Sequence, residues 1–178
     1  MAGKIDKPMK NASFKFMSGF FALRDKFSDP MKKIIKAKIK LGDHVLDYGC
    51  GPGSFSIAAA KVVGDSGKIY ATDIQPLSAE RIYEKAKKEV LHNVETITTD
   101  CNTGLNDDSI DVILCFDMFH MLKDQQKILK EFYRVLKPES ILSIDCHHMK
   151  DLESKVIESG LFKLKEKIDK TYNFVKIY

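Results

Sequence analysis

Short apolar runs rich in β-branched residues alternate with longer helical patterns from residue 44 onward, and this alternation leaves the chain few possible folds. The apolar runs lie at residues 44–49, 68–74, 94–100, 110–117 and 140–147. Between the last two runs, residues 124–137 repeat apolar side chains at helical spacing up to Pro138. Strands that alternate with helices in this way are typical of an α/β sheet with crossover connections.

The end of the chain has a different pattern. Residues 161–169 and 171–178 are two alternating segments that only a tight connection separates. Strands this close in sequence pair antiparallel. The sequence therefore predicts an antiparallel hairpin after the five strands that should be parallel.

Length and composition describe one globular unit. The 178 residues suffice for a single domain over residues 1–178, with a helical cap or lid at 1–40 and a core at 41–178. Hydrophobic residues at 44% and charged residues at 30% exclude disordered and collagen-like chains. No apolar run reaches the roughly 20 residues of a membrane-spanning helix, and the first ten residues lack the apolar stretch of a secretory signal. We expect a cytoplasmic protein without a transmembrane segment.

The four cysteines do not form a metal or disulfide motif. Cys50, Cys101, Cys115 and Cys146 show no C-x-x-C spacing. Three of them lie inside or at the ends of apolar runs, where free thiols are commonly buried. A zinc finger and a disulfide framework are therefore not expected.

A glycine-rich loop follows the first strand and opens a helix. Gly49, Gly51 and Gly53 let the backbone approach a ligand closely at the carboxyl end of that strand, which is the usual binding position in an open α/β sheet. Asp73 lies 20 positions after Gly53 at the end of the second strand, where a carboxylate can accept hydrogen bonds from both hydroxyls of a ribose. Together these features indicate a ligand that contains a nucleoside.

The loop does not suit a dinucleotide. The third glycine comes one residue earlier than in G-x-G-x-x-G, position 54 is Ser, and Pro52 removes a backbone N–H that a pyrophosphate would need. Asp47 adds negative charge where phosphate would lie. A ligand with positive charge and no phosphate fits better, such as a sulfonium amino acid joined to adenosine, which is S-adenosylmethionine (SAM).

The segment Val45 to Gly53, VLDYGCGPG, resembles the E/DxGxGxG loop of the class I SAM-dependent methyltransferases, and the resemblance covers roughly residues 30 to 178. It implies a Rossmann-like seven-stranded mixed sheet of order 3-2-1-4-5-7-6 between helices, with the last two strands as an antiparallel hairpin. It also implies methyl transfer from SAM, with S-adenosylhomocysteine as the product.

The same resemblance implies the cofactor contacts. Asp47 and the Gly49 to Gly53 loop would hold the methionine end, Asp73 would bind the ribose hydroxyls and Ile74 would pack on the adenine. Asp100 would accept from the adenine amino group beside the backbone of Cys101, although a strand-end acid is also typical of a turn or a helix cap. The implied cofactor-binding residues are Asp47, Tyr48, Gly49, Cys50, Gly51, Gly53, Asp73, Ile74, Asp100, Cys101 and Phe116.

Two further stretches are similar to the branch that includes ubiquinone and menaquinone biosynthesis enzymes and many small-molecule methyltransferases. They are residues 110–120 and EFYRVLKP at 131–138. The chain departs from that branch at Glu139 and Ser140, where the branch has Gly-Gly. No Asn-Pro-Pro-Tyr-like sequence follows the fourth strand, so the amino-group methylation of bases that this motif supports is not expected. The resemblance to this branch implies a small-molecule acceptor, and nucleic acid is not expected as a partner.

Several histidines lie near the expected site. His120, just past the fourth strand, is a candidate general base, or it closes a turn. Cys146, His147 and His148 end the fifth strand, but neighbouring strand residues point to opposite faces, so we expect no metal there. His147 or His148 would line the substrate pocket or lie partly exposed at the edge of the sheet.

The N-terminal segment is aromatic and basic. Residues 1–40 hold eleven Lys or Arg and three Asp, a balance of +8, whereas the other residues sum to −4. Asp29-Pro30 predicts a helix start, and an apolar face is expected from Met31, Ile34, Ile35 and Ile39. A lid over the donor site would be formed by Phe14, Phe16, Met17, Phe20, Phe21 and Phe27, and a helix packed as structural core is the alternative.

The basic residues either form a solvated face or attract an anionic acceptor or a lipid surface. The chain can form a homo-oligomer, because a partner subunit is the other possible cover for the site. Two other functions stay open beside methyl transfer: a non-catalytic SAM-fold binding or scaffold subunit, and a nucleotide-dependent oxidoreductase, which Pro52, Ser54 and Asp47 disfavour.

Overall fold

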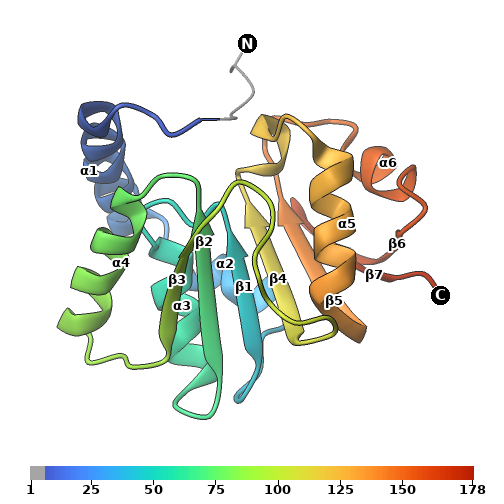
Figure 1. Cartoon of the computed structure of the whole chain (residues 1–178), viewed down its shortest axis with the longest axis horizontal. Coiled ribbons are helices and arrows are strands. Elements are labelled where there is room, and N and C mark those ends of the chain that lie inside the picture. The colour runs from blue at the N-terminus through green and yellow to red at the C-terminus, as the bar shows by residue number, and fades with distance from the viewer. Residues whose placement is uncertain (1–6) are drawn as a thin grey trace.

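The computed structural model describes residues 7–178 and has a seven-stranded sheet at its centre, in the order β3-β2-β1-β4-β5-β7-β6 (Figure 1). The strands are β1 (His44–Tyr48), β2 (Lys68–Asp73), β3 (Val94–Thr98), β4 (Ile110–Phe116), β5 (Leu136–Asp145), β6 (Phe162–Ile168) and β7 (Thr171–Lys176). The first five pair in parallel, and β7 pairs antiparallel with both β5 and β6. The predicted sheet order and hairpin are confirmed.

Helices cover both faces of the sheet. They are α1 (Asn11–Phe27), α2 (Met31–Lys36), α3 (Ser54–Val63), α4 (Leu77–Lys88), α5 (Gln125–Val135) and α6 (Leu152–Ile157), with a short 3-10 turn, η1 (Phe119–Met121). Successive residues of a strand point to opposite faces. In β1, Val45 packs with the alanines of α3, whereas Leu46 packs with Phe132 of α5. This alternation separates the apolar core under α2 and α3 from the core under α5 and α6, and a smaller cluster around Ile82 lies under α4.

The boundary between α5 and β5 differs from the prediction. The sequence pattern predicted a helix to residue 137 and a strand from 140, but the chain passes directly from Val135 into β5 at Leu136. Leu136 pairs with Ile110, and the register then shifts so that Ile141 pairs with Val112. Pro138 cannot donate a ladder hydrogen bond, so it lies in this irregular part of the strand instead of ending the helix.

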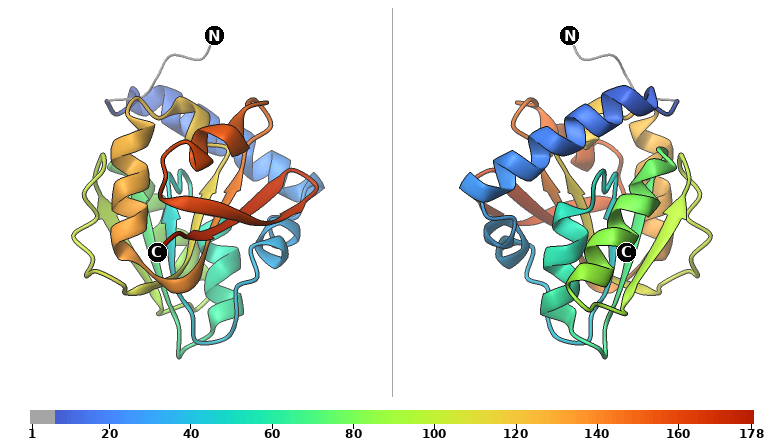
Figure 2. Two further views of the ribbon diagram at one scale, coloured as in Figure 1. Left: turned by 90° about the vertical axis from the view of Figure 1, so that its right-hand side faces the viewer. Right: turned by 90° about the vertical axis from the view of Figure 1, so that its left-hand side faces the viewer.

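Two N-terminal expectations need correction. Ile34 of α2 is buried against α3, but Ile35 is exposed, because the six-residue helix presents only one narrow face to the core. The aromatic residues of α1 are also divided, since Phe14 is buried and Phe16 is exposed. In Figure 2, α1 crosses one end of the sheet above α3 and α4, and its outer side is uncovered. Among the described residues, no helix is long and apolar enough to cross a membrane.

Candidate functional site

The backbone of the loop after β1 adopts the left-handed conformation that favours glycine at three positions. Gly49, Gly51 and Gly53 all have positive φ, at 74°, 52° and 81°. A Cβ at Gly49 would lie 2.2 Å from Cγ of Met118, and one at Gly53 would lie 2.4 Å from Cγ1 of Ile82. A Cβ at Gly51 would meet nothing within 4 Å, so this part of the loop faces open space. The loop thus keeps its backbone close to Met118 and α4 and open towards a ligand.

Asp73 ends β2 beside this loop. Its Oδ2 accepts a hydrogen bond from the Gly51 backbone N–H at 2.7 Å, and its Oδ1 accepts one from Gln75 N–H at 2.8 Å. Burial raises the pKa of the Asp73 carboxyl, and these backbone donors oppose the shift. Each carboxylate oxygen can accept a further hydrogen bond, so Asp73 both fixes the loop and offers acceptor positions to a ligand.

Asp47 lies beneath the loop and is buried. The Ser56 hydroxyl of α3 donates to its Oδ2 at 2.5 Å. Burial raises the pKa of Asp47 to about 7, Ser56 opposes this shift, and the nearby Asp73 adds to it. The structure places this carboxyl behind the cavities described next and not in their lining, so it ties β1 to the start of α3.

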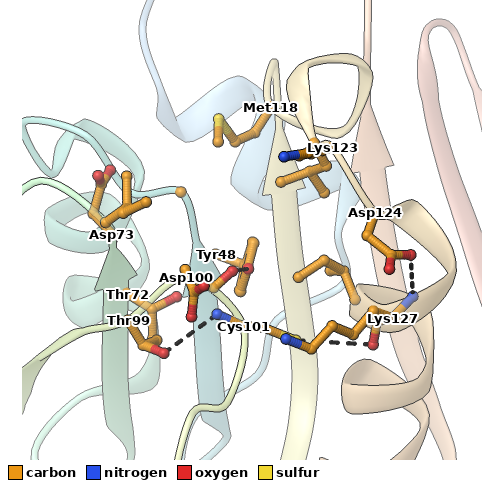
Figure 3. A pocket seen from close by; sticks show the side chains of 14 residues that line it. Tyr48, Thr72, Asp73, Thr99, Asp100, Cys101, Met118, Lys123, Asp124 and Lys127 are labelled. Carbon is orange, nitrogen blue, oxygen red and sulfur yellow. Dashed lines mark hydrogen bonds between the residues drawn. The ribbon is translucent and has the colours of Figure 1, made fainter. Parts of the chain in front are cut away.

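A cavity of about 520 Å³ opens at the carboxyl ends of β1, β2 and β3 (Figure 3). It brings together six of the residues implied by the family resemblance, which are Tyr48, Gly49, Asp73, Ile74, Asp100 and Cys101. The sequence did not indicate its other lining residues, which are Thr72, Thr99, Met118, Leu122, Lys123, Asp124, Lys127 and Ile128. Most of these follow β4 or lie at the start of α5, where no sequence motif marks a ligand contact.

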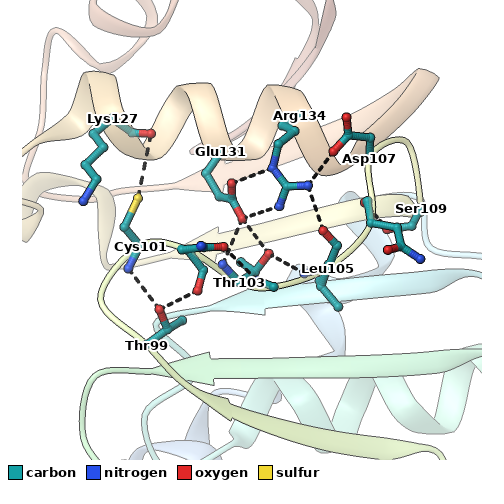
Figure 4. Close-up of polar contacts among 12 residues, drawn as sticks. Thr99, Cys101, Thr103, Leu105, Asp107, Ser109, Lys127, Glu131 and Arg134 are labelled. Carbon is teal, nitrogen blue, oxygen red and sulfur yellow. Dashed lines mark hydrogen bonds and ion pairs between the residues drawn. The ribbon is translucent and has the colours of Figure 1, made fainter.

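The segment after β3 is held in place by α5 (Figure 4). The backbone N–H and the hydroxyl of Thr103 both donate to Oε1 of Glu131, at 2.9 and 2.6 Å. Arg134 pairs with Glu131 and donates to the Leu105 carbonyl at 2.8 Å. This clamp explains the EFYRVLKP stretch, because its acid and its arginine fix the segment that carries Cys101 into the cavity.

A second cavity of about 220 Å³ lies between the glycine loop and α1. Its predicted members are Gly49, Cys50, Gly51, Asp73, Ile74 and Phe116, and Phe14, Met17, Phe21 and Arg24 of α1 also line it. Phe55 of α3 packs edge-on against Phe116, with ring centroids 5.1 Å apart. Both cavities share Gly49, Asp73, Ile74 and Met118, so one ligand can extend from the first cavity into the second.

The helix α1 is bonded to this site at both ends. Nε2 of Gln75 donates to the Met9 carbonyl at 2.8 Å just before the helix begins. Near its other end, Asp25 accepts a hydrogen bond from the Ser54 hydroxyl at the start of α3. The Arg24 guanidinium lies 4.5 Å from the ring centroid of Phe21. These contacts hold α1 over the smaller cavity.

Asp117 is a lining residue that the sequence did not single out. It follows β4 with φ of 55° and lines the smaller cavity. The Lys33 ammonium of α2 lies 3.0 Å from both Asp117 Oδ2 and Asp145 Oδ1, and His147 Nε2 lies 3.3 Å from Asp145 Oδ1. Ligand atoms of Asp117, Asp145 and His147 lie within 4.8 Å of one another, as at a metal site, but here Lys33 supplies the positive charge. The sequence could have indicated these two acids and the histidine only by their positions at the ends of β4 and β5.

His120 contacts other protein groups. Its Nδ1 lies 3.3 Å from Cys146 Sγ, and its ring packs against His148 with centroids 5.1 Å apart. Burial and the nearby His148 lower the pKa of His120. His120 is absent from the described lining of both cavities, so its role as a base stays a prediction without a geometric contact. Cys146 and His148 lie on the His120 side and His147 on the Asp145 side, so the three consecutive residues do not converge.

Comparisons with known proteins agree with this geometry. A family model described as a methyltransferase domain matches residues 39–175. A demethylmenaquinone methyltransferase of Lactobacillus johnsonii is 32% identical over 111 residues, which are 61% of this chain and 46% of that protein. An (S)-coclaurine N-methyltransferase of Thalictrum flavum is 30% identical over 114 residues, 63% of this chain and 31% of that protein. The matches thus span less than half the length of these two curated relatives.

A solved structure extends the comparison to nearly the whole chain. The crystal structure of a SAM-dependent methyltransferase from Aquifex aeolicus superposes with a TM-score of 0.80 and 26% identity, covering 94% of this chain and 99% of that one. The family model covers the glycine loop, the acid of β2 and the terminal hairpin in one match. The chain therefore belongs to the class I SAM-dependent methyltransferases, with S-adenosylmethionine as its cofactor.

Proposed function

We propose that this protein transfers the methyl group of SAM to a small, largely apolar acceptor that binds beneath α1. The observation that carries this proposal is the pair of adjoining cavities, which meet at Gly49, Asp73, Ile74 and Met118. The larger cavity has three carboxylates and two lysines among its lining residues, whereas eight Phe and Met side chains line the smaller one. Such a division suits a nucleoside on one side of the loop and an apolar acceptor on the other.

The residues of the larger cavity fit the cofactor. Asp73 would accept from the ribose hydroxyls, and Asp100 with the backbone of Cys101 would contact the adenine amino edge. The open space at Gly51 leaves room for the methionine end beside the loop. The Asp73 carboxylate supplies negative charge near that end, which suits a cationic ligand.

The acceptor would be positioned by the side chains of the smaller cavity. Bound SAM supplies an already activated methyl group, so the protein has to align the acceptor and exclude water. Holding the reacting groups in place can lower the barrier by about 7 to 11 kcal/mol. Phe21 and Met17 of α1 close this cavity from above and Phe116 borders it from the sheet. The helix α1 is thus proposed as the cover of the acceptor.

The acceptor is proposed as a class and not as one compound. The two curated relatives are named for demethylmenaquinone and for coclaurine, which are different small molecules. The lining of the smaller cavity also includes Arg24 and Lys7, so an acceptor with an anionic group would fit it. A cytoplasmic setting is part of the proposal, since all four cysteines are free thiols.

Calorimetric titration tests the cofactor part of the proposal. Asp73→Ala removes the ribose acceptor, and a hydrogen bond to a charged group contributes roughly 1.5 to 3 kcal/mol, so S-adenosylhomocysteine should bind at least about tenfold more weakly. Asp65→Ala, which removes an exposed carboxyl in the turn before β2, is the matched control and should bind as the wild type does. Equal affinity of a folded Asp73→Ala protein would show that the ribose is held elsewhere.

Ligand binding and turnover of the wild-type protein distinguish methyl transfer from the scaffold and oxidoreductase functions. A scaffold subunit would bind SAM and release no S-adenosylhomocysteine with any acceptor, whereas an oxidoreductase would bind NAD(H). We expect no heat from NAD(H), because Pro52 and Asp47 disfavour a pyrophosphate at the loop. Formation of S-adenosylhomocysteine with a panel of apolar small-molecule acceptors is the expected result.

A further inference from the structure

The outer face of α1 carries an uncovered apolar stripe. Phe16, Phe20, Leu23 and Phe27 lie at spacings of four, three and four residues, which places them on one side of the helix. Their exposed fractions are 82%, 60%, 55% and 84%. Single exposed apolar side chains are common on protein surfaces, but a contiguous row of four large ones is typical of an interaction site.

This stripe does not serve the fold or the cavity. The inward face of α1 holds Phe14, which is buried, and Met17 and Phe21, which line the smaller cavity. At helical spacing the stripe lies about a third of a turn away from these residues, and the right-hand view of Figure 2 shows no described element in front of α1. The helix α1 therefore has two apolar sides. One side packs on the rest of the protein, and the other is exposed and can contact a partner.

The surroundings of the stripe are basic. Residues 7–27, which include α1, hold five Lys or Arg and one Asp, a balance of +4, whereas Lys33, Lys36 and Lys38 of the next segment pair with acids of the core. Lys10 and Lys15 are exposed at the start of α1, and Lys32 is exposed just beyond its other end. An apolar stripe flanked by lysines is the pattern of a helix that lies in a membrane surface.

The positive charge around α1 distinguishes two possible partners of the stripe, which are a second copy of the chain and an anionic bilayer. Pairing α1 with α1 of a second copy would bring two segments of +4 together, which like-charge repulsion opposes. An anionic bilayer offers apolar depth for the aromatic side chains and negative headgroups for the lysines. We propose that α1 docks the protein on an anionic lipid surface, with Phe16, Phe20, Leu23 and Phe27 inserted at the interface.

Docking there would place the smaller cavity next to the lipid. The helix that would insert is the same helix that covers the cavity, so an apolar acceptor dissolved in the membrane would have the shortest route to the cofactor loop. This last step rests on the proposed function, whereas docking itself requires only the stripe and its charge.

Vesicle co-sedimentation tests the docking. The full chain should bind vesicles of phosphatidylcholine with phosphatidylglycerol, and vesicles of phosphatidylcholine alone should bind it at least about tenfold more weakly. The double variant Phe16→Ser/Phe27→Ser should lose at least about tenfold in binding to the anionic vesicles. Tyr83→Ser on α4, where the side chain is 68% exposed, is the matched control and should bind as the wild type does.

Two further measurements keep the outcomes distinct. Calorimetry with S-adenosylhomocysteine should give the same affinity for the wild type and the double Phe variant, so a loss of vesicle binding is not a loss of the cofactor site. Analytical ultracentrifugation should show the same oligomeric state for both proteins. A dimer that the Phe substitutions convert to monomer, or equal binding of wild type and double variant to vesicles, would overturn the proposal.

Discussion

Gly49 begins the glycine loop after β1, where the backbone passes close to the Met118 side chain. It combines a φ of 74° with a site where a Cβ would lie 2.2 Å from Met118. Gly49→Ala should therefore destabilise the fold by more than the roughly 1 to 2 kcal/mol of a left-handed alanine, and it should weaken binding of S-adenosylhomocysteine because Met118 is displaced into both cavities. Thermal denaturation and calorimetry measure the two effects.

Gly104 supplies the control for this prediction. Its φ is 70°, and an added Cβ would meet nothing within 4 Å. Gly104→Ala should show the backbone strain alone, with cofactor affinity unchanged. If the two variants lose the same stability and bind equally well, the close approach of the loop to Met118 has no functional role.

Titration of the buried Asp47 carboxyl should make the free energy of unfolding depend on pH. Its pKa is raised from 3.8 to about 7 in the fold by burial, so between these values the native state keeps a proton that the unfolded chain has lost. The contribution of this group to stability is therefore fully present at acid pH and is lost as the pH rises through about 7, and it amounts to at most about 4 kcal/mol.

Asp47→Asn removes this titration and keeps an oxygen that can accept from Ser56. The variant should be more stable than the wild type at about pH 8, and the difference should shrink towards about pH 5. Chemical denaturation at both pH values measures it. A variant that is less stable than the wild type at the higher pH would mean that the buried carboxylate is stabilised by charge.

At the scale of elements, periodicity predicted most of the fold. The strands of the sheet begin within a residue or two of their predicted positions, apart from β5, because alternating or continuous apolar runs fix them. The start of β5 was missed because Leu136 continues the helical spacing of α5 and only its pairing with Ile110 makes it a strand residue. Periodicity also divides the apolar residues of α1 into two sides, but it could not tell which side faces the protein.

The helix α1 should behave as a movable cover. It is held by the Gln75–Met9 and Ser54–Asp25 hydrogen bonds and by the buried Phe14, whereas the strands are held by continuous ladders. Without ligand, amides of Phe16 to Leu23 should exchange faster than those of β4, and S-adenosylhomocysteine should slow their exchange. Hydrogen exchange measures this, and equally high protection in both states would identify α1 as fixed core.

At the scale of the whole molecule, the site is assembled by topology. The carboxyl ends of parallel strands meet at one edge, so Gly49, Asp73 and Asp100 could be placed together from sequence. The ion-pair group of Lys33, Asp117 and Asp145 could not, because its members lie 84 and 112 residues from Lys33 and no motif joins them. The cover by α1 likewise depends on packing that spacing does not encode.

A crystal structure of the protein with S-adenosylhomocysteine would show which cavity holds the cofactor. We expect adenosine density in the cavity of about 520 Å³ and ribose hydroxyls on Asp73. The amino-acid end should lie beside Gly49 and Gly51, where the two cavities meet, with the part of the smaller cavity under α1 left for the acceptor. Density for the nucleoside under α1, or a ribose that does not contact Asp73, would contradict it.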